Sequence, residues 1–330
     1  MGTAIVGLGA FLPKERVTND DLVRRGVNTT DEWISARTGI SSRYWAGKDE
    51  ATSDLALAAG RMALEDAGAS INDVRLIICA TSSPDHPIPA TASLVQSRLG
   101  CRGAGAFDLN AVCSGFVHAV CAGFALCEQQ RDGLVLVIGA DTYSRWLDLR
   151  DRQTSIFFGD GAGAIVLAPS DRPSWLLASE HGSDGANADK IMVKMGGSRC
   201  PTTTQGLTDG QASLHMDGKA VWNFAVSHVP NLVRRVVEKS GLTLSQLDLV
   251  IPHQANARLL ETCADELGIE RRRMFMNLRD QGNTAAASIP MALEQARREG
   301  QVTAGSHLVL VGFGGGLAWS AACLKWGDGG

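Results

Sequence analysis

The sequence lacks an excess of positive charge, and this absence excludes one class of function. Its 330 residues carry a formal net charge of −4 and the pI is near 6.0, which gives no support for general nucleic-acid binding. Two basic clusters, Arg234-Arg235 and Arg271-Arg272-Arg273, lie in mixed-charge helical segments. We interpret them as solvated helix faces, with a local anionic partner as the alternative.

Paired cysteines are also absent from the sequence. The eight cysteines form no C-x-x-C pair, and none has metal-ligand spacing with a histidine, so the sequence predicts no metal site. Several of them lie inside apolar runs, where cysteine behaves as a small hydrophobic residue. Because nothing indicates a disulfide framework, we expect reduced thiols and a cytoplasmic location.

Long hydrophobic segments and a complete nucleotide motif are missing too. The longest apolar run, residues 111–127, is interrupted by Ser114 and His118, so it predicts a buried helix and no membrane span. No basic residue precedes the first apolar segment, and we therefore expect no signal peptide. An apolar strand ends at residues 7–9 with Gly-Leu-Gly, but Leu12 stands where a G-x-G-x-x-G motif has its last glycine.

What the sequence does contain is an internal repeat. Residues 68–77 align without a gap with residues 241–250, which is an offset of 173 in residue number. Residues 134–139 align with residues 307–312 at the same offset. Two independent matches at one offset predict a duplicated α/β domain, and a chain of this length suits two domains.

The two halves differ at one place. A final pair of strands, residues 163–167 and 320–324, is related by an offset of only 157 in residue number. The first half therefore carries about 16 additional residues, which we place between Asp141 and Phe158. Inserted connections of this kind are more often functional than filler. The predicted domains are residues 1–172, with the inserted loop, and residues 173–330.

Cys113 lies where a predicted strand ends and a long apolar helix begins. The first turn of a helix has unpaired N–H groups and the positive end of the macrodipole, which favour a thiolate. Lowering the pKa of a thiol by about two units requires roughly 2.7 kcal/mol, which we expect from the helix end and one further donor. A buried core cysteine is the alternative, and the repeat decides between the two.

The repeat brings two further polar residues toward this cysteine. The strand that ends at Ala80 in the first half ends at His253 in the second half. The turn before the Cys113 helix corresponds, within a few residues, to residues 282–284. If the halves pack about a pseudo-twofold axis, equivalent loop ends meet at the axis. We therefore expect Cys113, His253 and Asn283 to converge.

Six motifs follow one another along the chain in a specific order and spacing. They are Asp31-Glu32-Trp33-Ile34 with Arg37-Thr38-Gly39-Ile40, Ala111-Val112-Cys113-Ser114-Gly115-Phe116, Phe158-Gly159-Asp160-Gly161-Ala162-Gly163, Pro252-His253-Gln254-Ala255-Asn256, Gly282-Asn283-Thr284 and Gly312-Phe313-Gly314-Gly315-Gly316. Together they make the whole chain resemble the thiolase-like condensing enzymes, and among them the β-ketoacyl-acyl-carrier-protein synthase III family. The resemblance implies an α/β thiolase-like fold, in which two duplicated halves form a five-layered αβαβα sandwich, and a homodimer.

The resemblance also implies the chemistry of an acyltransferase. Cys113 would be the nucleophile that takes an acyl group from acyl-CoA, with the backbone N–H groups of Cys113 and Gly315 as the oxyanion hole. His253 and Asn283 would donate hydrogen bonds to the thioester of malonyl-acyl carrier protein during decarboxylation. The resulting carbanion would attack the acyl group and give 3-oxoacyl-acyl carrier protein. Acyl-CoA and malonyl-acyl carrier protein are then substrates, and no cofactor is expected.

The substrate-binding residues follow from the same resemblance. Trp33 and Arg152 match the pair that holds the adenine of CoA, and Arg37 matches a basic residue on the phosphate side. Ile88 stands where many members have an aromatic residue that reaches across the dimer, and we assign it to the primer pocket. Asn223 replaces a lysine that docks the carrier protein. The other matching positions are Gly218, Trp222, Ala255 and Asn256 for the pantetheine tunnel and Arg258 for carrier-protein docking.

Related enzymes differ at identifiable positions. Degradative thiolases have a second cysteine in the C-terminal glycine loop, and chalcone-synthase-like enzymes have a proline there, but residues 312–316 contain neither. Elongating ketosynthases have a second histidine where this chain has Asn283. The sequence leaves open a non-decarboxylating acyltransferase, a starter synthase for a specialised pathway with a non-acetyl primer, and a catalytically silent scaffold. The primer, the pathway and the carrier of the malonyl group are undetermined by sequence.

Overall fold

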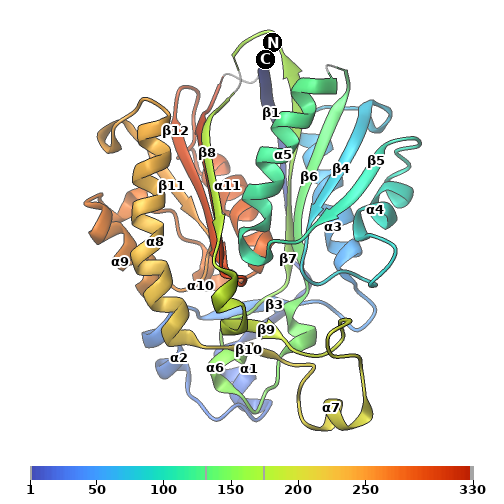
Figure 1. Ribbon diagram of the computed structural model, residues 1–330, viewed down its shortest axis with the longest axis vertical. Coiled ribbons are helices and arrows are strands. Elements are labelled where there is room, and N and C mark those ends of the chain that lie inside the picture. The colour runs from blue at the N-terminus through green and yellow to red at the C-terminus, as the bar shows by residue number, and fades with distance from the viewer. Residues whose placement is uncertain (1, 131, 174, 328–330) are drawn as a thin grey trace.

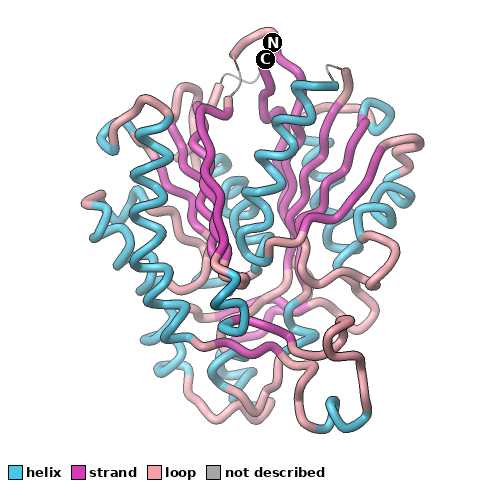
Figure 2. The backbone as a smooth tube through the Cα atoms, viewed as in Figure 1, coloured by secondary structure: helices cyan, strands magenta, loops and turns pink. Residues whose placement is uncertain are grey.

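The computed structural model describes residues 2–130, 132–173 and 175–327. Two mixed β-sheets lie side by side, with helices between them and on both outer faces (Figures 1 and 2). The strand order of the first sheet is β1 (Gly2–Phe11), β7 (Gly161–Ser170), β6 (Leu134–Asp141), β4 (Val74–Ala80) and β5 (Gly105–Leu109). The order of the second sheet is β11 (Leu249–Pro252), β12 (His307–Gly314), β13 (Ala318–Lys325) and β8 (Leu176–Ser183).

Three layers of helices alternate with the two sheets. Helices α5 and α11 form the middle layer and bury apolar side chains against both sheets. Helices α3 and α4 cover the outer face of the first sheet, and α8 and α9 cover that of the second. The predicted five-layered αβαβα sandwich is therefore confirmed. The bounds are α3 (Thr52–Asp66), α4 (Thr91–Leu99), α5 (Gly115–Gln130), α8 (Gly218–Lys239), α9 (Ala257–Leu267) and α11 (Ser288–Arg298).

The smaller elements gather at one end of the sandwich, at the bottom of Figure 1. One group lies between β1 and α3 in sequence, and a second group lies between β8 and α8. The first comprises β2 (Glu15–Thr18), α1 (Asn19–Arg24), α2 (Asp31–Thr38) and β3 (Ser42–Trp45), and the second comprises β9 (Ile191–Val193), α7 (Thr204–Thr208) and β10 (Leu214–Met216). Helices α6 (Arg152–Ser155) and α10 (Leu278–Gln281) are short, as are the 3-10 helices η2 (Val112–Ser114), η3 (Tyr143–Trp146) and η7 (Ala285–Ala287).

The register of the strands shows the duplication. Ile77 of β4 pairs in parallel with Leu136 of β6, and Val250 of β11 pairs in parallel with Val309 of β12. The two pairs are related by the same offset in residue number that the sequence repeat predicts. The second sheet has four strands in the described part of the chain, and at the position of β5 it has an isolated parallel bridge between Val250 and Met274. The predicted boundary after residue 172 lies between β7 and β8 and stays a prediction.

The extra residues of the first half lie between β6 and β7. Gly163 of β7 and Ser320 of β13 hold equivalent positions in the two registers, as the smaller offset of the last strand pair predicts. The connection that precedes β7 spans residues 142–160 and contains η3 and α6, whereas its counterpart before β13 is residues 315–317. The position of the insertion is therefore confirmed, and it extends as far as Asp160, slightly beyond Phe158.

The long apolar run forms helix α5 in the middle of the sandwich. Among the residues that the structure describes, one helical segment, Val112–Gln130, is long and apolar enough to cross a membrane by length and composition alone. Gly123 lets this helix approach the first sheet closely, because a Cβ there would lie 2.8 Å from Val137 Cγ2 and 2.9 Å from Leu167 Cδ1. Packing between two sheets explains why this helix is apolar, as the sequence predicts.

Candidate active site

An apolar cavity of about 80 Å³ lies between the sandwich and the smaller elements. It brings together Cys113 from η2, His253 from the loop after β11, and Asn283 from the loop between α10 and η7. These side chains come from both halves of the chain, and their convergence is as expected. The lining residues are Cys113, Tyr143, Phe157, Phe158, Ile191, Met216, Gly218, Val221, Trp222, His253, Ala255, Asn256, Leu259, Asn283, Phe313 and Gly314.

Cys113 is buried beside the glycine loop that follows β12. A Cβ on Gly314 would lie 2.8 Å from Cys113 Cβ and 3.1 Å from Cys113 Sγ, so any side chain at position 314 would collide with the thiol. Burial raises the pKa of Cys113, and the buried carboxylate of Asp141 adds to this effect. The expected lowering of this pKa is therefore wrong, because removal of water outweighs the helix end.

His253 is held by the first residue of α11. Its Nδ1 lies 2.8 Å from Ser288 Oγ, and the N–H of Gln254 donates to the same Oγ at 3.3 Å. The Ser288 hydroxyl can donate to Nδ1 while its oxygen accepts from Gln254, and in that arrangement the proton of the neutral imidazole is on Nε2. Burial lowers the pKa of His253 to about 3, against an opposite effect of the Ala285 carbonyl, so the imidazole is neutral at pH 7.

Asn283 is fixed by three hydrogen bonds that leave its side-chain nitrogen for the cavity. Its Oδ1 accepts from the N–H of Ala285 at 2.9 Å. Its backbone N–H donates to the carbonyl of Phe157 at 2.8 Å, and its carbonyl accepts from the N–H of Gly159 at 2.9 Å. The last two bonds attach the Asn283 loop to the inserted segment, so both halves of the chain position this side chain.

The turns at Cys113 and Asn283 have the same backbone geometry. Val112 has φ 49° and Ala285 has φ 48°, and these residues are related by the offset of the repeat. In the same way, Asn110 Oδ1 accepts from the N–H of Val112 at 3.1 Å, as Asn283 does from Ala285. A positive φ is uncommon for residues other than glycine, so its repetition confirms that the two turns are equivalent. Asn110 is thus the counterpart of Asn283, and Cys113 is the counterpart of Ala286.

Asp141 is buried where β6 ends and stabilises two loops at once. Its Oδ2 accepts from the N–H of Ala286 at 3.0 Å. Its Oδ1 accepts from the backbone N–H groups of Ser82 and Ser83 at 2.9 and 3.1 Å and from the hydroxyl of Thr81 at 3.1 Å. Burial raises the pKa of Asp141, while these hydrogen bonds act in the opposite direction. The carboxyl group therefore connects the loop after β4 to the start of α11.

A wider cleft of about 860 Å³ opens outside the cavity. The guanidinium groups of Arg37 and Arg152 lie 5.1 and 4.7 Å from the centre of the Trp33 ring, so two cations face one aromatic side chain. The cleft and the cavity are adjacent, since they share the lining residues Phe157, Met216, Gly218, Trp222 and Asn256. Arg258 also lines the cleft, whereas Ala255 lines the inner cavity.

Two of the expected site residues line neither the cavity nor the cleft. Ile88 lies in the loop between β4 and α4 and is 85% exposed. Gly315 is adjacent to Gly314, but it contributes to a separate groove with Val112 and not to the cavity itself. Within one chain, the assignment of Ile88 to the primer pocket has no support.

Several lining residues were missed by the sequence reasoning. Tyr143 and Phe158 lie at the two ends of the inserted segment, and Ile191 and Met216 belong to the sheet formed by β9 and β10. The aromatic side chains inside an insertion were a usable signal for the first two. Nothing in the spacing of β9 and β10 indicates that they fold over Cys113. In the described ranges, no group of three or more His, Cys, Asp or Glu side chains is arranged for a metal ion.

The neutral state of His253 predicts a pH dependence of stability. The folded pKa of about 3 lies below the ordinary value of 6.5, so unfolding takes up a proton as the pH falls below 6.5. Stability is then lost between pH 6.5 and about 3, by at most ~1.4 kcal/mol per pH unit. We expect urea unfolding at pH 7, 6 and 5 to show a steeper loss for the wild type than for His253→Gln.

The variant is the necessary reference for this measurement. Asp160, whose pKa burial raises to about 6, contributes a pH dependence of the opposite sign, and it is present in both proteins. The difference between the two unfolding curves therefore reports His253 alone. Equal slopes for wild type and His253→Gln would contradict the neutral imidazole.

Two family models match the chain. The model for "3-Oxoacyl-[acyl-carrier-protein (ACP)] synthase III" matches residues 107–185, and the model for the C-terminal part of the same synthase matches residues 237–326. The first segment contains Cys113, and the second contains His253 and Asn283. The matched segments therefore include all three side chains that converge on the cavity.

Known proteins are similar over almost the whole chain. The beta-ketoacyl-[acyl-carrier-protein] synthase III of Neisseria gonorrhoeae (strain NCCP11945) is 45% identical over 323 residues, which cover 98% of this chain and 98% of that protein. The crystal structure of 3-oxoacyl-(acyl carrier protein) synthase III from Pseudomonas aeruginosa PAO1 superposes with a TM-score of 0.90 at 40% identity and covers 99% of both chains. The priming β-ketosynthase of the R1128 polyketide pathway has a TM-score of 0.92 at 33% identity, covering 100% of this chain and 97% of that one. The chain therefore belongs to the 3-oxoacyl-[acyl-carrier-protein] synthase III family.

Proposed function

We propose that this protein is a condensing acyltransferase that joins an acyl group from acyl-CoA to malonyl-acyl carrier protein and releases carbon dioxide. The product is 3-oxoacyl-acyl carrier protein, and the reaction initiates fatty-acid synthesis. One observation carries the proposal. A buried thiol, a neutral imidazole and a carboxamide face one apolar cavity, which adjoins a cleft with two arginines over a tryptophan.

In the first half-reaction, Cys113 takes the acyl group from CoA. Cys113 Sγ attacks the thioester carbon, the carbon–sulfur bond to CoA breaks, and a new thioester forms on the enzyme. The raised pKa of Cys113 means that the thiol is protonated before the attack. Its proton leaves as the new bond forms and ends on the sulfur of CoA, so the step is balanced without a cofactor.

The equivalence of the two halves supports the backbone N–H of Cys113 as an oxyanion donor. The counterpart of this N–H, at Ala286, donates to a carboxylate oxygen of Asp141. The counterpart of Asp141 is Gly314, which has no side chain that could accept from Cys113. An oxyanion of the substrate would take the position that the carboxylate oxygen holds in the other half. Gly315, next in the chain, is the proposed second donor.

In the second half-reaction, His253 and Asn283 stabilise the charge that forms when carbon dioxide leaves. Cleavage of the bond to the carboxylate places an electron pair on the malonyl carbon and, by resonance, on the thioester oxygen. With the Ser288 hydroxyl donating to His253 Nδ1 and the Ala285 N–H donating to Asn283 Oδ1, both residues have an N–H for that oxygen. Neutral donors in a buried site suit this step. The carbanion then attacks the carbonyl carbon of the Cys113 thioester, the carbon–sulfur bond to Cys113 breaks, and the released thiolate takes up a proton from solvent.

The outer cleft suits the nucleotide part of CoA. A base between the Trp33 ring and the Arg152 guanidinium would be held by stacking on both faces. Arg37 is available to the phosphates, and the pantetheine arm would follow Gly218, Trp222, Ala255 and Asn256 inward to Cys113. We assign Arg258, at the mouth of the cleft, to docking of the acidic carrier protein, with Asn223 unable to supply a second charge.

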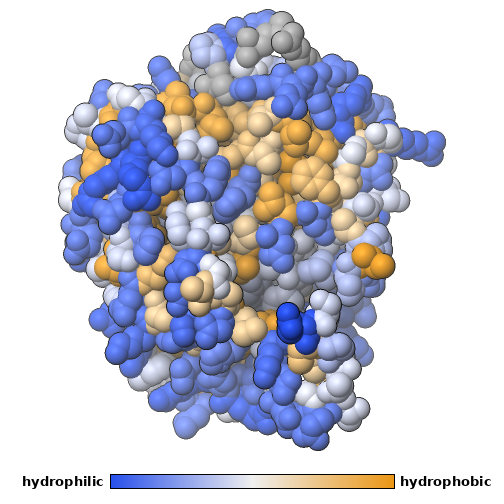
Figure 3. All heavy atoms as spheres, in the orientation of Figure 1, coloured by the Kyte–Doolittle hydropathy of each residue, from blue (hydrophilic) through white to orange (hydrophobic). Residues whose placement is uncertain are grey.

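A homodimer in the cytoplasm completes the proposal. Strand β5 is an edge of the first sheet and pairs only with β4 in the described part of the chain, and its Phe107 is 38% exposed. The face of the molecule that is drawn in Figure 3 has an apolar area in its upper part, in the region of α5 in Figure 1. An unpaired edge beside apolar surface is a typical interface. A second copy paired along β5 would cover both.

Intact-mass analysis and carbon dioxide release together test the proposed function. Incubation with acetyl-CoA is expected to add one acetyl group to Cys113, and addition of malonyl-acyl carrier protein is expected to release carbon dioxide and remove the acetyl group. Acylation without decarboxylation would support a simple acyltransferase instead. No adduct with any acyl-CoA would support a catalytically silent scaffold.

Tyr143 is expected to restrict the primer to short acyl groups. Its ring is stacked on Phe158 with centroids 5.1 Å apart, and it meets the edge of Trp146 at 5.2 Å. Its hydroxyl lies 2.9 Å from Ser82 Oγ, so the ring is fixed beside Cys113. Each methylene that a pocket rejects changes selectivity by about 10-fold or more. We expect Tyr143→Ala to raise the ratio of octanoyl to acetyl loading by at least about 10-fold.

Competition between acetyl-CoA and octanoyl-CoA, followed by mass spectrometry of Cys113, measures this ratio. Tyr143→Phe is the matched control, because it keeps the ring and loses only the hydroxyl, and its preference should stay close to that of the wild type. A wild type that loads octanoyl groups as readily as acetyl groups would show that Tyr143 does not set the length.

A further inference from the structure

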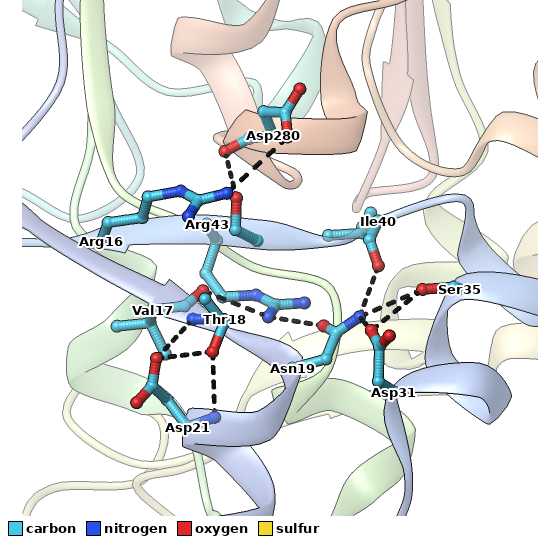
Figure 4. Close-up of polar contacts among 11 residues, drawn as sticks. Arg16, Val17, Thr18, Asn19, Asp21, Asp31, Ser35, Ile40, Arg43 and Asp280 are labelled. Atoms are coloured by element: carbon cyan, nitrogen blue, oxygen red, sulfur yellow. Dashed lines mark hydrogen bonds and ion pairs between the residues drawn. The ribbon is translucent and has the colours of Figure 1, made fainter.

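Arg43 is a charged side chain that the proposed mechanism does not use, yet it is fully buried. It lies on β3, next to β2, and Figure 4 shows it among polar groups from several segments. Its Nη1 donates to Asn19 Oδ1 at 2.8 Å, and its Nη2 donates to the carbonyl of Ile156 at 2.7 Å. Its Nε has no hydrogen-bond partner in the described part of the chain. Arg43 thus connects two segments that are far apart in the sequence.

The first connection leads to helix α2. Asn19, which accepts from Arg43, also bonds to both ends of this helix. Its Nδ2 donates to Asp31 Oδ1 at 2.7 Å and to the carbonyl of Ile40 at 2.8 Å (Figure 4). These two acceptors lie at the start of α2 and just after its end. Helix α2 carries Trp33, the aromatic ring of the outer cleft. The position of this ring therefore depends on Asn19 and, through it, on Arg43.

The second connection leads to the inserted segment. Ile156 is the C-cap residue that follows α6, and α6 carries Arg152, whose guanidinium lies over the Trp33 ring. The next residue, Phe157, lines both the cleft and the cavity. The carbonyl of Phe157 accepts the N–H of Asn283. The Arg43 contact with Ile156 is thus immediately adjacent in the chain to the backbone group that positions Asn283.

Direct packing adds a third link between Arg43 and the Asn283 loop. A Cβ on Gly282 would lie 2.8 Å from Arg43 Cβ, and a Cβ on Gly159 would lie 3.0 Å from the same atom. Both glycines are needed for this close approach, and Gly282 also has φ +70°. Gly282 immediately precedes Asn283, so a shift of the Arg43 backbone moves the loop directly.

The chemistry of the guanidinium explains why these contacts are restrictive. Burial lowers the pKa of Arg43 to about 10, against the attraction of Asp31, so the side chain stays charged at neutral pH. A buried charge without a carboxylate in direct contact is costly unless its N–H groups find acceptors. The guanidinium of arginine is planar and rigid, so it can donate only to acceptors that lie within a narrow range of positions. Asn19 and Ile156 must therefore stay where the guanidinium places them.

We propose that Arg43 is a positioning residue that aligns the CoA-binding pair, α2 and α6, with the Asn283 loop through its contacts with Asn19 and Ile156. This inference rests on the proposed function, because it concerns the same cleft and cavity. Arg43 lines neither of them, so its effect on substrates is indirect. One side chain thereby couples the binding of the first substrate to the geometry used for the second.

Three variants separate the two connections. Arg43→Met removes both, Arg43→Lys keeps the charge without the planar fork, and Asn19→Ala removes the α2 connection alone. A displacement of about 1 Å at a reacting group lowers rates by on the order of 100-fold. For Arg43→Met we expect at least about a 10-fold weaker CoA affinity and at least about a 10-fold slower malonyl-acyl carrier protein decarboxylation. For Asn19→Ala we expect the weaker affinity with the decarboxylation rate retained, and Arg43→Lys should fall between.

The readouts are the CoA dissociation constant from calorimetry, KM for acyl-CoA loading, and the decarboxylation rate at saturating malonyl-acyl carrier protein, each per folded molecule. A purely structural role would lower the melting temperature and leave these values unchanged, and that result would overturn the proposal. If Arg43→Met does not fold, Arg43→Lys and Asn19→Ala still test the proposal, by comparing the change in CoA affinity with the change in decarboxylation rate. A wild type that binds CoA but neither loads acyl groups nor decarboxylates malonyl thioesters would refute the proposed function, while the calorimetric comparison would still test Arg43.

Discussion

Replacing Cys113 by alanine is expected to abolish acyl loading while the enzyme still decarboxylates malonyl-acyl carrier protein. The thiol forms the only covalent bond to the acyl group in the proposed mechanism, so condensation should fall by roughly 10³-fold or more. Decarboxylation requires only the two N–H donors, and neither His253 nor Asn283 depends on the thiol for its hydrogen bonds. Loss of the sulfur atom at position 113 should therefore leave the His253 and Asn283 donors in place.

Mass spectrometry after incubation with acetyl-CoA measures the loading, and carbon dioxide release measures the decarboxylation. Cys101→Ala is the matched control, because Cys101 is also buried but packs in the outer cluster with α3 and α4. The control should load acetyl groups at the wild-type rate. Formation of 3-oxoacyl product by Cys113→Ala at an undiminished rate would refute the assignment of the nucleophile.

Replacing His253 by alanine is expected to have the reverse effect. Removal of one preorganised donor to a developing oxyanion typically lowers the rate by about 10²–10³-fold, and we expect a loss of about this size in malonyl decarboxylation. Acyl loading should persist, because Cys113 and the backbone donors are untouched. Asn283→Ala should behave similarly, and the double variant should lose less than the product of the two effects, since both residues act on one oxygen.

Ser288→Ala tests whether the proton of His253 is on Nε2. Without the Ser288 hydroxyl, Nδ1 loses its donor, and the proton can then move from Nε2 to Nδ1. Decarboxylation should then fall although His253 is present, with loading retained. Nitrogen NMR of labelled histidine distinguishes the two tautomers directly.

One result for His253→Ala would contradict its assigned role. If this variant lost acyl loading and kept malonyl decarboxylation, His253 would act in the first half-reaction and not in the second.

The internal repeat is the reason that so much of the site was predictable. Its constant offset placed the ends of β4 and β11, and of β6 and β12, at equivalent positions before any contact was known. Loop ends on a pseudo-twofold axis must meet, so Cys113, His253 and Asn283 were expected together, as they are found. The same offset holds at the turns, where Asn110 is the counterpart of Asn283 and Cys113 is the counterpart of Ala286.

The protonation state of Cys113 was not predictable in the same way. Its position before α5 argues for a lowered pKa when the helix end alone is considered. The direction is reversed by burial and by Asp141, whose side chain belongs to the end of β6, beyond the whole of α5 in the chain. Electrostatic effects of this kind add over all neighbours in space, and sequence order does not reveal those neighbours.

The shape of the cavity likewise depends on segments that carry no motif. Tyr143 is held by stacking on Phe158 and by its hydroxyl contact with Ser82. The strands β9 and β10 supply Ile191 and Met216 from a long excursion between β8 and α8. Such contacts arise from packing between distant elements, for which one sequence contains no periodic signal.

The sequence by itself therefore determined the duplicated fold, the convergence of the three reactive side chains and the family resemblance, because motifs and repeats are properties of order and spacing. Only the tertiary structure decided how large the cavity is, that the Cys113 thiol is protonated at rest, that His253 Nδ1 contacts Ser288, and that Arg43 connects α2 and α6 to Asn283. Each of these depends on distances between groups far apart in the chain. Interatomic distances, side-chain burial and electrostatic fields are set by packing, and this packing forms only when the two halves of the chain come together.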